Sequence, residues 1–178
     1  TLVRPWGEDV GLIGKVLDIG ANGIMASHVE SPARARAIME QARFAPRGNR
    51  GFSPLTKYDA LGEPLRMLDD ATYVVAQIEG RQALANVAAI ATVPGVDAVF
   101  VGPYDLALSL DVPPGSPTVF AAAEELSKAV PDGVALGIYI DDPAKCGDWA
   151  ARRFALQCVS FDGRMLANAA RSVVTQAK

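Results

Sequence analysis

Residues 73–106 constrain the fold of this chain more than any other stretch. Tyr73–Ile78 and Ala98–Val101 are short, apolar and partly β-branched runs, which are typical of strands buried on both faces of a parallel sheet. Between them, residues 81–91 carry apolar side chains at helical spacing, and Pro94-Gly95 ends that segment. The stretch therefore predicts a strand, a helix and a second strand parallel to the first.

The same alternation of strands and helices continues along the chain. Further strand-like runs lie at residues 2–4, 24–29, 134–140 and 154–161, and helical patterns lie at 10–17, 33–43, 104–110, 119–130, 142–151 and 165–177. Ser31-Pro32 and Asp142-Pro143 each place a capping side chain before a proline, which suits the first turn of a helix. Six strands that alternate with helices predict a parallel α/β sheet.

Two architectures fit this alternation, an open doubly wound sheet and a TIM (β/α)8 barrel. The dinucleotide motif GxGxxG and the phosphate-loop motif GxxxxGK[ST] are both absent from the sequence, so nothing supports a nucleotide site. A closed barrel needs eight strands, and only about six βα units are found here. With 178 residues, half of them hydrophobic, residues 1–178 are predicted to form a single domain.

Composition excludes several classes of function. The formal net charge is -3 and the basic residues are scattered, so nucleic acid is not an expected partner. No apolar run reaches the length of about 20 residues that spans a bilayer, and the first residues lack the features of a secretion signal. We therefore expect no membrane partner and a cytoplasmic location.

The two cysteines do not suggest a disulfide or a zinc site. Cys146 and Cys158 are far apart in the sequence and form no CxxC motif. Cys158 lies in a strand-like run, where we expect it to be a small core residue.

Two acidic residues stand where strands give way to helices. Glu79 follows the run 73–78, and Asp105 follows the run 98–101. In parallel α/β folds the carboxyl ends of the strands carry the functional groups, so these carboxylates are expected to share one space. Oxygen ligands of this kind suit a hard divalent ion such as Mg²⁺ or Mn²⁺. Alternatively, Glu79 caps the helix that follows it and Asp105 lies in the first turn of the next helix, each favoured by the helix dipole.

The segment 46–62 is longer than most connections in α/β proteins, which span about 2 to 6 residues. Its basic residues Arg47, Arg50 and Lys57 could contact an anionic substrate. A solvated loop would have the same composition, so both interpretations stay open.

Five segments resemble a known family of enzymes. They are VRPW (3–6), VLDIGANGIM (16–25), GNRGF (48–52), QIEGRQALANV (77–87) and VDAVFVGPYDLALSL (96–110), and they resemble the metal-dependent (class II) pyruvate aldolases of the HpcH/HpaI family. The resemblance implies a TIM barrel that cleaves a 4-hydroxy-2-oxo acid to pyruvate and an aldehyde, or runs the reverse addition. It also implies a divalent metal (Mg²⁺, Mn²⁺ or Co²⁺) and a homo-oligomer, a trimer or hexamer.

The resemblance also implies roles for individual residues. Glu79 and Asp105 match the metal ligands, and Gln77 matches a residue that hydrogen-bonds the substrate. Tyr104 and Asp105 match positions that contact the substrate, Tyr104 through its backbone. Arg4 matches the arginine that stabilises the enolate, a role that suits a fixed guanidinium charge.

The general base of the family does not match a residue of this chain. In the family it is a histidine on a strand before VRP, whereas this chain begins at VRP. The single histidine, His28, does not match it, and we expect His28 to be a polar residue near a strand end. Asp18 matches the catalytic acid that partners the family histidine, so here it would need another partner. We therefore expect the chain to be a fragment of a longer protein.

Two other functions remain open at this stage. One is a lyase or thioesterase that acts on a CoA-linked acid, as in the citrate-lyase β-subunit-like relatives of the family. The other is a non-catalytic barrel remnant that binds an oxo acid. In an aldolase, residues 52–62 are the expected place for selection of the aldehyde.

Overall fold

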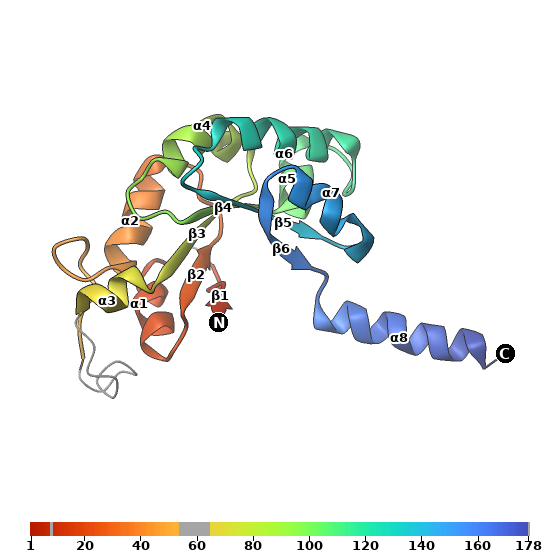
Figure 1. Cartoon of the computed structure of the whole chain (residues 1–178), viewed down its shortest axis with the longest axis horizontal. Helices are drawn as coiled ribbons and strands as arrows, with labels where there is room; N and C mark the ends of the chain where they lie inside the picture. Colours follow the sequence, from red (N-terminus) through yellow and green to blue (C-terminus); the bar gives the residue numbers. More distant parts are fainter. Residues whose placement is uncertain (8, 54–64, 178) are drawn as a thin grey trace.

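The computed structural model describes residues 1–7, 9–53 and 65–177, and its centre is one parallel sheet. The six strands are β1 (Leu2–Val3), β2 (Gly23–Ala26), β3 (Tyr73–Ile78), β4 (Ala98–Val101), β5 (Ala135–Ile140) and β6 (Phe154–Val159), and they lie side by side in chain order. The sheet curves into a half-barrel (Figure 1). This confirms the prediction of a TIM-type α/β fold with about six βα units.

The helices pack mainly on the outer face of this curved sheet. They are α1 (Gly11–Asp18), α2 (Pro32–Ala42), α3 (Leu65–Asp70), α4 (Arg81–Ala91), α5 (Pro103–Leu110), α6 (Pro117–Ala129), the 3₁₀ turn η2 (Pro143–Lys145), α7 (Cys146–Ala151) and α8 (Asp162–Gln176). Figure 1 shows α2, α4 and α6 arched over the sheet. The expected caps are present, since the side chains of Ser31 and Asp142 accept hydrogen bonds from the backbone of Arg34 and Ala144.

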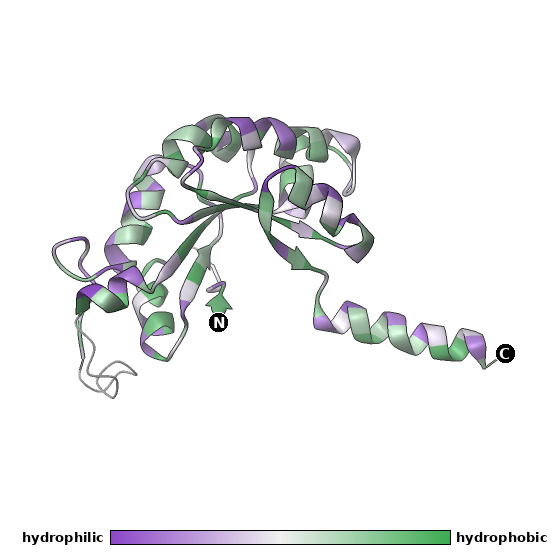
Figure 2. Cartoon of the chain, in the orientation of Figure 1, coloured by the Kyte–Doolittle hydropathy of each residue, from purple (hydrophilic) through white to green (hydrophobic). Residues whose placement is uncertain are grey.

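Alternating side chains give the sheet two different faces. One set points outward to the helices and forms the main core, with Ile24, Val74, Val99 and Ile138 fully or almost fully buried. The other set points into the hollow of the half-barrel and forms a smaller cluster around Val75, Ala98 and Phe100. Because both faces are largely apolar, the strands are hydrophobic almost throughout (Figure 2). The hollow face leads to the candidate site.

Several local predictions differ from the structure. The strand predicted at 24–29 ends at Ala26, because His28 adopts a left-handed backbone (φ 51°) that an extended ladder does not tolerate. The helix predicted at 142–151 begins as the 3₁₀ turn η2. Cys158 is exposed because it points into the open hollow and not toward the helices.

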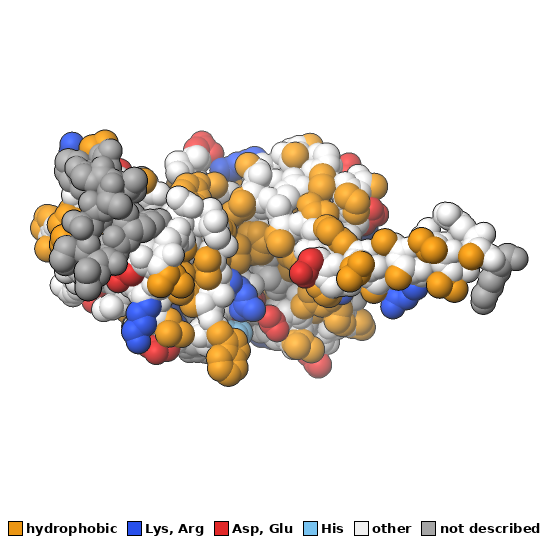
Figure 3. All heavy atoms as spheres, turned by 90° about the horizontal axis from the view of Figure 1, so that it is seen from below, with side chains coloured by type: hydrophobic (Ala, Val, Ile, Leu, Met, Phe, Trp, Pro, Cys, Tyr) orange, Lys and Arg blue, Asp and Glu red, His pale blue; other side chains and the backbone are white. Residues whose placement is uncertain are grey.

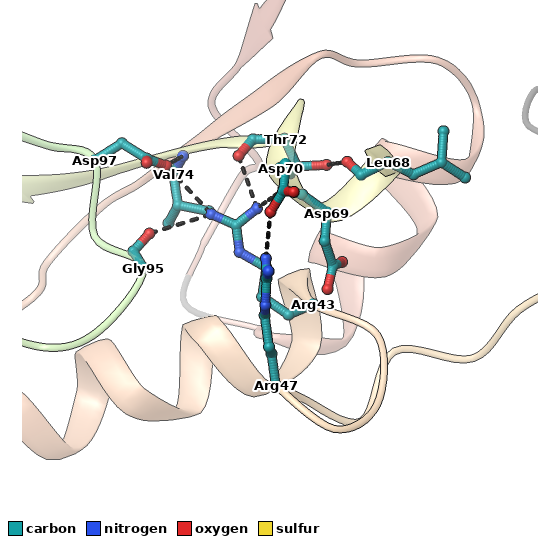
Figure 4. A network of polar contacts seen from close by, with 9 residues as sticks. All are labelled: Arg43, Arg47, Leu68, Asp69, Asp70, Thr72, Val74, Gly95 and Asp97. Carbon is teal, nitrogen blue, oxygen red and sulfur yellow. Dashed lines mark hydrogen bonds and ion pairs between the residues drawn. The ribbon is translucent and has the colours of Figure 1, made fainter. Parts of the chain in front are cut away.

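A buried arginine joins several elements at the amino ends of the strands (Figure 4). The guanidinium of Arg43 donates to the backbone oxygens of Asp69, Thr72 and Gly95 and to the carboxylate of Asp97. Its side chain is only 7% exposed. These contacts tie the end of α2 to the segments that precede β3 and β4.

The last helix, α8, contacts the rest of the molecule through Arg164 in its first turn and otherwise extends away from it. It extends away from the sheet in Figure 1, and none of its described residues is buried. Its exposed apolar side chains include Met165, Leu166, Val173 and Val174, and orange atoms run along it in Figure 3. In the part of the chain that the structure describes, no helix is long and apolar enough to cross a membrane.

Candidate active site at the carboxyl ends of the strands

Four of the residues singled out in the sequence line one cavity in the hollow of the half-barrel. Arg4, Gln77, Tyr104 and Asp105 border a space of about 220 Å³ at the carboxyl ends of β1, β3 and β4. The remaining walls are largely apolar and come from Met25, Phe100, Gly102, Pro103, Tyr139 and Cys158. The cavity therefore combines a few polar groups with apolar walls, as small-molecule sites commonly do.

The strand geometry explains why these side chains meet. Val3 packs on the outer core, so Arg4, the next residue, points to the opposite face and into the hollow. Gln77 lies two residues after Val75, which belongs to the inner cluster, and therefore points the same way. Asp105 arrives from the first turn of α5, directly after β4.

Gly102 allows the head groups of Gln77 and Glu79 to meet at the end of β4. A Cβ atom at this position would lie 2.8 Å from Gln77 Nε2 and 2.8 Å from Glu79 Oε2, closer than non-bonded atoms approach. Both head groups therefore occupy the space that a side chain at position 102 would need. The glycine brings Glu79 to the edge of the cavity.

The carboxylate of Glu79 is buried and only half satisfied. Oε1 accepts a hydrogen bond of 2.8 Å from the backbone N–H of His28. Within the described part of the chain, Glu79 Oε2 and Gln77 Oε1 are buried without a hydrogen-bond partner. Buried polar atoms without partners are uncommon in folded proteins, so these two oxygens mark a place where a ligand would be stabilised.

The electrostatic environment of Glu79 confirms that the other charged groups are close. Burial raises the pKa of Glu79, the hydrogen bond from His28 lowers it, and the neighbouring charges of Asp105 and Arg4 raise and lower it respectively. Burial outweighs the favourable contacts, and the net pKa lies above its usual range. A cation beside this carboxylate would remove the cost of its charge.

The residues at this site fit a divalent metal held by few protein ligands. Over residues 1–7, 9–53 and 65–177, no group of three or more His, Cys, Asp or Glu side chains is arranged to hold a metal ion. Glu79 and Asp105 would thus supply two carboxylates, a donor set that suits Mg²⁺ or Mn²⁺ with water and substrate completing the shell. The unpartnered Glu79 Oε2 is the atom that such an ion would satisfy.

The alternative role of Glu79 as a helix cap is wrong. The N-cap of α4 is Gly80, and no side chain caps the helix from that position. The carboxylate of Glu30 instead accepts a 2.8 Å hydrogen bond from the backbone N–H of Ala83 in the first turn. Asp105 does lie in the first turn of α5, so a favourable helix dipole and a ligand role are compatible there.

The structure does not bring Asp18 or Arg50 to the cavity. Asp18 ends helix α1, which places it at the amino ends of the strands, and its carboxylate forms a 2.6 Å ion pair with Arg50. Arg50 is buried, and its guanidinium lies 4.6 Å from the ring centre of Phe44. Arg50 therefore pairs with Asp18, and a contact of Arg50 with the substrate stays a prediction from the sequence. Lys57 and most of the segment 52–62 lie outside the described residues.

With this geometry established, comparison with known proteins decides the family. The model of the family HpcH/HpaI aldolase/citrate lyase matches residues 1–169. This chain belongs to the HpcH/HpaI family. A pyruvate aldolase from Rhizobium etli is 37% identical over 166 residues, which cover 90% of this chain and 62% of that protein.

Two further comparisons agree with this assignment. A hydroxypyruvate/pyruvate aldolase from Pseudomonas aeruginosa is 32% identical over 184 residues, covering 99% of this chain and 69% of that protein. The crystal structure of an HpcH/HpaI aldolase from Desulfitobacterium hafniense matches with a TM-score of 0.91 at 29% identity, covering 99% of this chain and 71% of that one. The chain thus spans roughly two thirds of the length of these relatives.

A polar cluster beside the cavity was not predicted from the sequence of this HpcH/HpaI family member. The hydroxyl groups of Tyr104 and Tyr139 both donate to the carboxylate of Asp141, and Arg164 donates to Asp141 and to the Tyr104 hydroxyl oxygen. Burial and the bond to Asp141 raise the pKa of Tyr139 to about 12. The cluster fixes the ring of Tyr104 against the cavity. Its one visible signal was the acidic pair Asp141-Asp142 after a strand.

Proposed function

We propose that this chain carries most of the active site of a carbon–carbon lyase of the aldehyde-lyase type, a class II pyruvate aldolase. The reaction is the metal-dependent cleavage of a 4-hydroxy-2-oxo acid to pyruvate and an aldehyde, and the reverse aldol addition. The observation that carries the proposal is the buried Glu79 Oε2, which has no hydrogen-bond partner among the described residues and lies beside a cavity lined by Arg4, Gln77 and Asp105. The relatives named pyruvate and hydroxypyruvate aldolases support it.

Glu79 and Asp105 would hold the divalent metal, Mg²⁺, Mn²⁺ or Co²⁺. When bound there, the ion would act as a Lewis acid toward the keto oxygen and carboxylate of the pyruvate unit. Two protein carboxylates leave positions for both of these substrate oxygens and for water. Asp105 would thus serve both metal and substrate.

The other polar residues of the chain would act on the 2-oxo acid. Cleavage leaves negative charge on the keto oxygen, and the Arg4 guanidinium is placed to stabilise it in a cavity of low polarity. The amide of Gln77 would donate to the substrate and fix its orientation. Tyr104 and Asp105 lie in the first turn of α5, where backbone N–H groups lack acceptors within the helix and favour a carboxylate.

These residues bind and polarise the substrate, and none of them is assigned as the proton-transfer group. The catalytic role that the family resemblance implies for Asp18 is not part of this proposal, because its carboxylate pairs with Arg50 at the opposite ends of the strands. The proposal therefore concerns the 2-oxo acid half of the reaction.

The test measures release of pyruvate from a 4-hydroxy-2-oxo acid by the full-length protein, with and without EDTA. We expect activity that EDTA abolishes, that Mg²⁺ or Mn²⁺ restores, and that Glu79→Ala removes. Glu125→Ala is the matched control, because that carboxylate is exposed and pairs only with Lys128 among the described contacts. Activity that survives both EDTA and Glu79→Ala would refute the proposal.

The two alternative functions, a lyase or thioesterase on a CoA-linked acid and a non-catalytic barrel, predict different results with other ligands. A lyase or thioesterase on a CoA-linked acid would turn over an acyl-CoA thioester and not a free oxo acid. The aldolase names of the relatives do not favour this alternative. A non-catalytic barrel would bind oxalate, a mimic of the enolate, and turn over neither substrate.

We also propose that the protein acts as a homo-oligomer, a trimer or hexamer. The exposed apolar side chains of α8 support an interface between copies of the chain. The cytoplasmic location stays a prediction from the sequence.

A further inference from the structure

His28 occupies an unusual backbone position beside the candidate metal ligand. It lies just beyond the end of β2, and its φ of 51° is left-handed, a conformation uncommon for residues other than glycine. The next residue, Val29, donates a 3.2 Å hydrogen bond from its N–H to the backbone oxygen of Gln77. The chain therefore turns at His28 and runs across the end of β3, next to Glu79.

Two nitrogen atoms of His28 face the same oxygen of Glu79. The backbone N–H donates to Glu79 Oε1 at 2.8 Å, and the imidazole Nδ1 lies 3.3 Å from that atom. The Glu79 side chain is 1% exposed, whereas the imidazole is 48% exposed. The backbone hydrogen bond therefore holds Oε1 from the side of β2, and the imidazole lies against the same oxygen.

With Oε1 held in this way, the second oxygen has a defined direction. Oε2 lies toward Gly102, at the end of β4, and has no hydrogen-bond partner among the described residues. Asp105 follows Gly102 in the first turn of α5. Oε2 is thus directed to the side from which the second carboxylate arrives.

We propose that His28 is a positioning residue, whose backbone N–H and imidazole fix Glu79 Oε1 so that Oε2 is presented to a divalent metal. The inference rests on the proposed function, since it assumes that Glu79 is a metal ligand. Partners of this kind, which contact a ligand and not the metal, commonly change metal affinity about 10- to 100-fold when they are removed. In this role the Nδ1–H of His28 would donate a hydrogen bond to Oε1, with the proton staying on the ring.

Two variants of His28 separate the role of the imidazole from that of the backbone, and a third variant, at another position, is the control. His28→Gly deletes the ring and tolerates the left-handed conformation. His28→Asn keeps a side-chain donor and also tolerates that conformation, so it tests rescue. Asp111→Gly is the matched control, because Asp111 is another left-handed residue (φ 58°) and caps the far end of α5.

The measurement is Mn²⁺ binding to the full-length protein without substrate, followed by the electron paramagnetic resonance of free Mn²⁺. We expect His28→Gly to weaken binding about 10-fold, His28→Asn to weaken it less, and Asp111→Gly to leave it unchanged. The thermal unfolding temperature of each variant is also measured in the presence of EDTA. A purely structural histidine would lower the unfolding temperature without changing Mn²⁺ affinity, and that result would overturn the inference.

Glu79→Gln distinguishes failure of the inference from failure of the proposed function. If Glu79→Gln weakens Mn²⁺ binding and neither His28 variant does, the metal site stands and the positioning role is wrong. If Glu79→Gln binds Mn²⁺ as the wild type does, or if the wild type does not bind it, the proposed metal site is wrong and the inference falls with it.

Discussion

At the scale of single residues, Glu79 shows a conflict between stability and function. Its side chain is 1% exposed, and one of its carboxylate oxygens has no partner within the described structure. A buried charge of this kind costs stability unless a cation or a proton neutralises it. Buried groups with perturbed pKa values occur mainly at catalytic and binding sites. Glu79 is therefore the residue on which the proposed function depends most.

The raised pKa of Glu79 gives a prediction with a defined sign. Because the folded protein holds the proton more tightly than the unfolded chain, protonation of Glu79 stabilises the fold below its ordinary pKa of 4.5. That contribution is lost as the pH rises through the raised pKa. We therefore expect metal-free Glu79→Gln to unfold at a higher temperature than the wild type at pH 7, with a smaller difference at pH 4.

Calorimetry at the two pH values checks this expectation, and Mn²⁺ provides the control. At a concentration one hundred times its dissociation constant, Mn²⁺ should stabilise the wild type by about 2.7 kcal/mol and should not stabilise Glu79→Gln. If metal-free Glu79→Gln is less stable than the metal-free wild type at pH 7, the buried charge of Glu79 does not lower the stability of the fold and the prediction is wrong.

At the scale of elements, the junction of β4 with α5 depends on a glycine. Gly102→Ala would place a methyl group 2.8 Å from both Gln77 Nε2 and Glu79 Oε2, so both head groups would have to move. Displacements near 1 Å in an active site can lower activity about 10²-fold, and we expect a loss of that order in pyruvate release. Gly133→Ala is the control, because nothing lies within 4 Å of its added Cβ.

Arg43 has the corresponding structural role at the other ends of the strands. Arg43→Met would leave the carboxylate of Asp97 and three backbone oxygens without this donor. Breaking a buried ionic network by removing one partner costs about 3–5 kcal/mol. Urea denaturation should show a loss of that size. Arg47→Met breaks only a solvent-exposed pair with Asp70, so it should leave the urea midpoint almost unchanged.

At the scale of the whole molecule, α8 is the element that the rest of the chain does not cover. Leu166 and Val173 lie two turns apart on one side of this helix and are 73% and 66% exposed. We expect light scattering of the wild type to give a mass that is a multiple of the mass of the single chain used in the measurement. Leu166→Glu combined with Val173→Glu should lower that mass toward one chain.

Asn168→Glu controls for the added charge, because residue 168 lies on a different side of the helix from Leu166. A wild type that is monomeric, or a double variant with unchanged mass, would refute the oligomer that we propose. The unfolding temperature of each variant is measured as well, so that a variant that aggregates because it is unfolded is recognised by an unfolding temperature below that of the wild type.

Local patterns were enough to predict the parallel sheet and to place Glu79 and Asp105 at the same edge of it, after β3 and β4. Buried parallel strands require continuous apolar runs, and their carboxyl ends meet at one edge, so the position of each acid after its run was informative. The contact of His28 with Glu79 joins residues 51 apart and depends on a left-handed turn and on the register of β2 with β3. The pairing of Asp18 with Arg50 and the exposure of Cys158 likewise depend on how the sheet curves. Only the tertiary structure decided these features, because curvature and register are set by packing of the whole sheet and leave no pattern in neighbouring residues.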